Sequence, residues 1–77
     1  MVKPTSVTNR IRALRSAHGE MTQAELADRV GVTRQTLIAI EQSRYSPSLE
    51  VAFKIARVFG APLDDVFQYP VSPEEQP

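Results

Sequence analysis

Two neighbouring side chains, the guanidinium of Arg34 and the carboxamide of Gln35, have the chemistry needed to read base pairs of duplex DNA. An Arg fork can donate to O6 and N7 of guanine, and a Gln amide can pair with N6 and N7 of adenine. Ile38 and Ala39 follow at helical spacing and could contact thymine methyl groups. At about 100° per residue, a helix places all four side chains on one stripe. The spacing therefore predicts a surface suited to the edges of bases.

The helix that must present this stripe is expected to run from residue 34 to about residue 42. Thr33 precedes it and has the side chain of an N-cap residue. Leu37 and Ile40 fall on the opposite side, where we expect them to face the core. Ile38 taken alone could equally be an isolated surface hydrophobe, which is common on soluble proteins.

Another short helix, over residues 23–30, is expected immediately before the helix at residues 34–42. Thr22 and Glu25 have the spacing of a capping box at its start. Gly31 follows its last apolar position, where the chain needs a left-handed residue. Two short helices joined by such a turn describe a helix-turn-helix unit.

Three further helices complete the expected fold. They are expected from residue 6 or 7 to His18, over residues 49–59 after the cap Ser48, and from Pro62 with Asp64 and Asp65 in the first turn. Apolar residues cover a wide arc of the fourth helix, with Leu49, Ala52, Phe53, Ala56 and Phe59 on one side and Val51, Ile55 and Val58 beside them. The sequence predicts an all-α protein of five helices.

The chain has 77 residues, which is room for one domain with a small core. We expect that domain over residues 9–69. Residues 1–8 would form an N-terminal arm and the start of the first helix, and residues 70–77 a Pro- and Glu-rich tail.

Composition excludes several other kinds of protein. The absence of Cys excludes a disulfide scaffold, a thiolate nucleophile and a Cys-based zinc site. The single His, His18, is expected to interact with a helix C-terminus, and the adjacent Asp64 and Asp65 would point about 100° apart on a helix. We therefore expect no enzyme, no metal and no cofactor. The aliphatic run at residues 37–40 is far short of the ~20 residues of a membrane span, so we expect a soluble cytoplasmic protein.

The charges are distributed unevenly although the net charge is zero. Up to Pro47 there are seven bases and four acids, whereas from Ser48 onwards there are two bases and five acids. This asymmetry favours one face for an anionic partner and another face turned away from it. Most of the bases are Arg, which suits planar bidentate contacts.

The same residues resemble a known family. The segments that carry the resemblance are Thr22-Gln23-Ala24-Glu25-Leu26-Ala27, Gly31-Val32-Thr33-Arg34-Gln35-Thr36-Leu37 and Ile40-Glu41, followed by Tyr45-Ser46-Pro47-Ser48-Leu49 and residues 62–68. Over about residues 9–67 the chain is similar to the Cro/cI (Xre-type) helix-turn-helix regulators, in particular to short stand-alone members such as the cytolysin repressor. The resemblance implies a lambda-repressor-like fold. Glu20 departs from the pattern as an extra residue, which should lengthen the first turn.

The resemblance also implies roles for individual residues. Base contacts would come from Arg34, Gln35, Ile38 and Ala39. Phosphate contacts would come from Thr22, Gln23, Thr33, Thr36, Arg44, Tyr45 and Ser46. Arg15 and Glu41 would form an internal ion pair. Simpler interpretations exist for some of these residues. Gln23 could be an ordinary surface residue, and Thr33 and Thr36 could only cap or fill the helix. Two further bases, Arg10 and Arg12, are better explained as a solvated face.

One reading helix contacts few bases, so such proteins bind near-palindromic sites as homodimers. The resemblance places the dimer contact at Pro62, Leu63 and Val66. A stripe of Val51, Ile55 and Val58 is an alternative contact, although Val51, Ile55, Val66 and Phe67 are better explained as closing the monomer core.

The sequence favours a homodimeric, sequence-specific DNA-binding regulator that acts as a repressor, with double-stranded DNA and a second copy as partners and no evident small-molecule effector. Two alternatives stay open. One is the antitoxin of a toxin–antitoxin pair, and the other is a helical protein-interaction domain that does not bind DNA.

Overall fold

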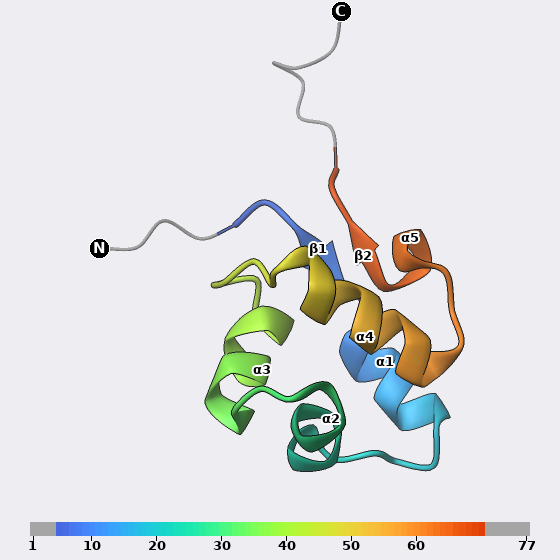
Figure 1. The fold of residues 1–77 in the computed structure, drawn as a ribbon. Helices are drawn as coiled ribbons and strands as arrows, with labels where there is room; N and C mark the ends of the chain where they lie inside the picture. The colour runs from blue at the N-terminus through green and yellow to red at the C-terminus, as the bar shows by residue number, and fades with distance from the viewer. Residues whose placement is uncertain (1–4, 71–77) are drawn as a thin grey trace, which may run out of the picture.

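The computed structural model describes residues 5–70, which form five short helices and one pair of two-residue strands (Figure 1). The helices are α1 (Ile11–Ala17), α2 (Gln23–Val30), α3 (Arg34–Glu41), α4 (Leu49–Phe59) and α5 (Leu63–Val66). The strands β1 (Thr8–Asn9) and β2 (Phe67–Gln68) pair antiparallel. The prediction of a five-helix, mostly helical fold is confirmed, and the strand pair is a small addition to it. Residues 1–4 and 71–77, which include most of the predicted tail, lie outside the described part.

The helix α4 crosses the middle of the molecule, with α1 behind it, α2 and α3 to one side, and α5 with β2 to the other (Figure 1). Each helix contributes to a single core. Its buried side chains are Ile11, Met21, Leu26, Ala27, Val30, Leu37, Ile40, Ala52, Ile55, Ala56, Phe59 and Val66. No helix among residues 5–70 has both the length and the apolar character that crossing a membrane requires.

Local side-chain caps define the starts of the three central helices. The hydroxyls of Thr22, Thr33 and Ser48 accept hydrogen bonds from the backbone N–H three residues on, at 3.0, 3.0 and 3.2 Å. These caps agree with the predictions, because each depends only on residues of the same turn. The capping box is only half formed, because the carboxylate of Glu25 accepts from the hydroxyl of Thr22, at 3.2 Å, instead of from its backbone N–H.

The start of the first helix differs from the prediction. α1 begins at Ile11, because Thr8 and Asn9 pair with Gln68 and Phe67 and cannot also be helical. The N–H of Arg10 donates to the carbonyl of Val66 at 2.9 Å, which extends this pairing. The first helix is therefore shorter than its apolar spacing indicates.

The exposed side of α4 is the second departure. Leu49 and Phe53 belong to the apolar arc that the sequence shows on this helix, but they are 66% and 52% exposed. The core takes the side of α4 that carries Ala52, Ile55, Ala56 and Phe59, with Val51 and Val58 partly buried against it, and only Leu49 and Phe53 of the apolar arc face solvent.

The last helix is also shorter than expected. Pro62 is the N-cap of α5 rather than its first residue, and Phe67 already belongs to β2. Glu20 has a φ of 59° directly after Gly19 at 74°, so two consecutive left-handed residues accommodate the extra residue in the turn before α2.

Candidate nucleic-acid interface

The turn between α2 and α3 sets the angle between the two helices. Gly31 ends α2 with a φ of 76°, a left-handed conformation that costs a residue with a Cβ about 1–2 kcal/mol. The N–H of Val32 then donates to the carbonyl of Ala27 at 3.1 Å. These bonds close the end of α2 and allow Thr33 to start α3 two residues later.

The helix α3 presents two different sides. Leu37 and Ile40 are buried, as predicted from their spacing. Arg34 and Gln35 are exposed at the N-terminal end of the helix. Ile38 and Ala39 are partly buried, so the exposed stripe is widest at the start of the helix and narrows towards its end.

The carboxylate of Glu41, at the end of α3, connects three helices. Arg15 of α1 donates to it twice, from Nε at 2.8 Å and from Nη2 at 3.0 Å. Gln23 of α2 donates its amide Nε2 to the same carboxylate at 3.3 Å. Arg15 also donates to the carbonyl of Met21 at 2.8 Å, which holds the loop before α2. The structure thus brings together the two residues for which the family resemblance implies a pair.

The side chain of Gln23 has a partner within the protein, Glu41, that the sequence did not indicate. Its side chain was expected to bind phosphate, yet it is partly buried and bonded to Glu41. A phosphate at this place would compete with Glu41 for the amide of Gln23. Thr22 is exposed, but its hydroxyl already makes two hydrogen bonds to Glu25: it accepts from the backbone N–H and donates to the carboxylate.

A cleft of about 820 Å³ lies between α1, the start of α2 and α3. Its lining residues are Arg12, Arg15, Thr22, Gln23, Ala24, Arg34, Glu41 and Gln42. Three guanidinium groups and one carboxylate make this cleft suited to an anion. Arg12 was expected to be a solvated residue, although its position one turn before Arg15 places both side chains on one side of α1.

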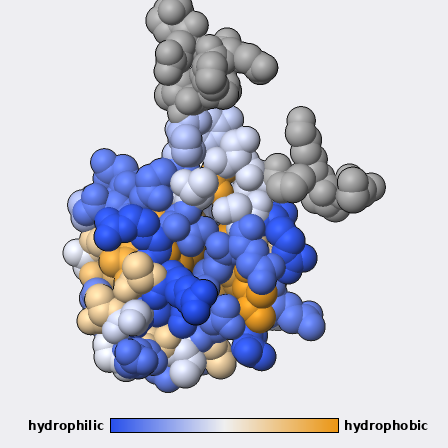
Figure 2. Space-filling view, turned by 180° about the vertical axis from the view of Figure 1, so that it is seen from behind, coloured by the Kyte–Doolittle hydropathy of each residue, from blue (hydrophilic) through white to orange (hydrophobic). Residues whose placement is uncertain are grey.

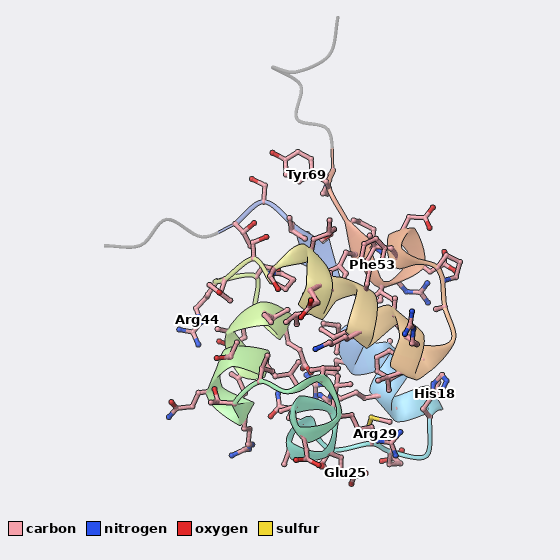
Figure 3. The ribbon with its side chains drawn as sticks, viewed as in Figure 1. His18, Glu25, Arg29, Arg44, Phe53 and Tyr69 are labelled. Atoms are coloured by element: carbon pink, nitrogen blue, oxygen red, sulfur yellow. The ribbon has the colours of Figure 1, made fainter. Side chains whose placement is uncertain are left out.

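The loop after α3 carries the remaining candidate phosphate contacts. Arg44, Tyr45 and Ser46 are all exposed. Arg44 projects away from the body of the protein beside α3 (Figure 3). Its Nε donates to Gln42 at 2.8 Å, which leaves its terminal nitrogens with no bond to the described residues. Ser43 turns this loop with a φ of 58°.

The two threonines of α3 are bonded to each other. Thr33 accepts from the N–H of Thr36 at 3.0 Å and donates its hydroxyl proton to the Thr36 hydroxyl at 2.9 Å. The hydroxyl proton of Thr36 is therefore available to an outside acceptor.

The side of the protein on which α1 lies is mainly hydrophilic, as the view from behind shows (Figure 2).

The residues expected at a dimer contact do not all lie on the surface. Pro62 is exposed and Leu63 is partly buried, but Val66 is 0% exposed. The expectation that Val66 contacts a partner is therefore wrong, and the expectation that its side chain closes the monomer core is confirmed. A groove of about 400 Å³ beside Leu63 is lined by Val7, Asp64, Phe67, Gln68 and Tyr69.

Other polar groups have structural partners. His18 shares a hydrogen bond of 2.9 Å with the carbonyl of Leu14 at the end of α1, and its ring meets Phe59 edge to face at 5.1 Å. Among the described residues, no three His, Asp or Glu side chains are grouped so that they could hold a metal ion.

Asn9 is a structural residue that the sequence analysis missed. Its amide spans the gap between β1 and the end of α3, donating to the carbonyl of Ile40 at 2.9 Å. The only local signal is an Asn two residues before an apolar helical position, where its oxygen accepts from the N–H of Ile11 at 3.1 Å.

The fold and this geometry define a helix-turn-helix domain. Comparison with known proteins agrees: residues 11–66 match the helix-turn-helix family HTH_3. The chain belongs to this family of Cro/cI (Xre-type) DNA-binding transcriptional regulators.

Individual relatives carry corresponding names. The chain is 49% identical over 61 residues to MJ0272, an uncharacterised HTH-type transcriptional regulator of Methanocaldococcus jannaschii, and the match covers 79% of this chain and 91% of that protein. It is 34% identical over 59 residues to RstR, the cryptic phage CTXphi transcriptional repressor of Vibrio cholerae, with 77% of this chain and 52% of RstR covered. These relatives are regulators rather than enzymes, in agreement with the sequence analysis.

A solved structure shows the same fold. The crystal structure of a candidate DNA-binding protein from Bacteroides fragilis superposes with a TM-score of 0.69 at 22% identity, covering 80% of this chain and 98% of that one. At this identity the likeness concerns the fold alone.

Proposed function

We propose that the protein recognises a specific DNA sequence by inserting the N-terminal end of α3 into the major groove. The observation that carries this proposal is the exposure of Arg34 and Gln35 side by side at that end, while Leu37 and Ile40 anchor the opposite side. In helix-turn-helix proteins the first residues of the second helix are those that meet base edges. Arg34 would select guanine and Gln35 adenine, with Ile38 and Ala39 near thymine methyl groups.

Phosphate contacts would flank this helix on two sides. The cleft beside α1 offers Arg12 and Thr22, with Gln23 if it leaves Glu41, and the loop after α3 offers Arg44, Tyr45 and Ser46. Thr33 and Thr36 would contribute backbone and hydroxyl groups between them. Such contacts set the register of the protein on the duplex but carry no sequence information themselves. Binding would therefore weaken steeply with added salt.

A homodimer would place its two α3 helices in successive turns of the major groove on one face of the duplex, about 34 Å apart. Leu63 and Pro62, beside the groove that Phe67 and Tyr69 line, are the surface that we assign to this contact. Two-fold symmetry of the protein would then require a near-palindromic operator.

Occupation of such an operator would act as repression, by excluding other proteins from the same DNA. The name of the Vibrio cholerae relative, a transcriptional repressor, supports this role. A regulator of this kind would act in the cytoplasm, where the DNA lies.

Binding-site selection from random duplexes with the full chain tests the proposal. We expect an enriched, near-palindromic sequence whose half-sites change when Arg34 or Gln35 is replaced by Ala. Recovery of no enriched sequence, with a folded protein, would overturn the proposal and favour a protein-interaction domain.

A further inference from the structure

The main chain at the end of α3 is tied to the N-terminal strand by a single side chain. Nδ2 of Asn9 donates to the carbonyl of Ile40 at 2.9 Å, with a longer contact of 3.4 Å to that of Glu41. Oδ1 of Asn9 accepts from the N–H of Ile11 at 3.1 Å. Both polar atoms of this partly buried amide are thus bonded, one to the start of α1 and one to the end of α3.

Asn9 is in turn fixed to the far end of the chain. It lies opposite Phe67 in the strand pair, and the N–H of the next residue, Arg10, donates to the carbonyl of Val66. Hydrogen bonds therefore connect α5 and β2 through Asn9 to the last turn of α3. The Arg15–Glu41 pair joins the same turn to α1, but through a side chain rather than through the main chain.

The angle of α3 matters because readout of bases is geometrically strict. A helix of eight residues is about 12 Å long, so a tilt of about 5° around its C-terminal end moves its first residue by about 1 Å. A displacement of about 1 Å exceeds the range of donor–acceptor distances that a hydrogen bond tolerates. Phosphate contacts are less demanding, because they come from long and flexible side chains.

We propose that Asn9 is a positioning residue, which sets the angle at which α3 presents Arg34 and Gln35 and fixes that angle relative to α5 and β2. The proposal rests on the DNA-reading function proposed above. Loss of this tie should reduce the preference for the operator over unrelated DNA, while general attraction to phosphates persists.

The variant Asn9→Ser separates the two bonds. A Ser hydroxyl can accept from the N–H of Ile11 in the same kind of turn, although more weakly. It has no amide nitrogen to reach the carbonyl of Ile40. The matched control is Thr8→Ala in the same strand, because the Thr8 hydroxyl reaches only the carbonyl of Gln68, at 3.4 Å.

The experiment uses the full chain and two duplexes, the selected operator and a scrambled sequence of equal length. We expect Asn9→Ser to lower the ratio of the two affinities about fivefold to tenfold, the effect of about one hydrogen bond, and to leave affinity for the scrambled duplex within about twofold. Thr8→Ala should match the unmodified protein in both measurements. A ratio that Asn9→Ser leaves unchanged overturns the proposal, as does an equal loss of affinity for both duplexes.

Amide hydrogen exchange without DNA supplies an independent readout. The N–H groups of Ser43 and Arg44, which bond to the carbonyls of Ile40 and Ala39, should exchange faster in Asn9→Ser than in Thr8→Ala. If the unmodified protein prefers no duplex, the proposed function fails, whereas this exchange comparison still decides whether Asn9 holds the end of α3. Equal exchange in both variants overturns the positioning role.

A second variant covers the case in which Asn9→Ser does not fold. Asn9→Asp keeps the acceptor for Ile11 but lacks the donor, so it should show the same selective loss of operator preference. If neither variant folds, as judged by circular dichroism, Asn9 serves folding only and the proposal is overturned.

Discussion

Arg15 and Glu41 form a bidentate ion pair that joins α1 to the last residue of α3. The two bonds measure 2.8 and 3.0 Å, and the side chains are 14% and 8% exposed. Because water reaches this pair poorly, a charge left without its partner here is costly. The pair lies at the opposite end of α3 from Arg34, so it holds the helix without involving the side chains that we assign to base contacts, although both residues line the cleft that we assign to phosphate.

Replacing Arg15 with Ala should lower the free energy of unfolding by about 3 kcal/mol, because the carboxylate of Glu41 would keep only Gln23 as a partner. Urea denaturation followed by circular dichroism measures this loss. The control is Lys54→Ala, which breaks a surface pair with Glu50 at 3.5 Å, 51% and 81% exposed. It should cost less than about 0.5 kcal/mol. Similar losses in both variants would show that the Arg15–Glu41 pair has no special role.

Replacing Gln35 with Ala should weaken binding by about 1–3 kcal/mol at one base position of each half-site, because the lost amide contact specifies a single base. Fluorescence anisotropy with a panel of operators, each altered at one base pair, measures the effect position by position. The Lys54→Ala variant again serves as the control and should keep the full pattern of preferences. A uniform loss at every position would be inconsistent with base readout by Gln35.

Replacing Arg44 with Ala should weaken binding to all duplexes by a similar factor, because the residue is assigned to phosphate rather than to a base. The slope of log K against log salt concentration should become shallower by about one. Titrations at several salt concentrations measure it. Arg57 provides the control, since it lies with Phe53 on the exposed side of α4. An equal change of slope in Arg57→Ala would argue against a specific contact by Arg44.

Replacing Leu63 with Glu should raise the dissociation constant of the dimer at least about tenfold, because burial of a Leu side chain contributes about 1.5–3 kcal/mol. Sedimentation equilibrium measures it, with circular dichroism to check folding. The matched variant is Leu49→Glu, on the exposed apolar side of α4. Dissociation by Leu49→Glu rather than by Leu63→Glu would move the dimer contact to α4.

Much of the fold follows from short segments of sequence. The limits of α2 and α4 were predicted to the residue, because Thr22 and Ser48 cap the starts and Gly31 and Gly60 end the helices with left-handed conformations. These signals act within one turn of helix and need no knowledge of the rest of the chain. The buried side of α3 was predictable for the same reason, since Leu37 and Ile40 lie three residues apart.

Other features required the tertiary structure. The apolar arc of α4 is too wide to show which part faces the core, so the exposure of Leu49 and Phe53 could not be predicted. The buried position of Val66 depends on how the short α5 is packed against the other helices.

The sequence by itself determined the helix-turn-helix unit and the residues that it exposes at the start of α3, because capping and helical periodicity are local properties. Only the tertiary structure decided what holds that helix in place. The start of α1 is set by strands nearly 60 residues apart, and the end of α3 is held by Asn9, Arg15 and Gln23 from three other elements. Such long-range hydrogen bonds depend on the relative placement of whole elements, for which side-chain spacing along the chain carries no signal.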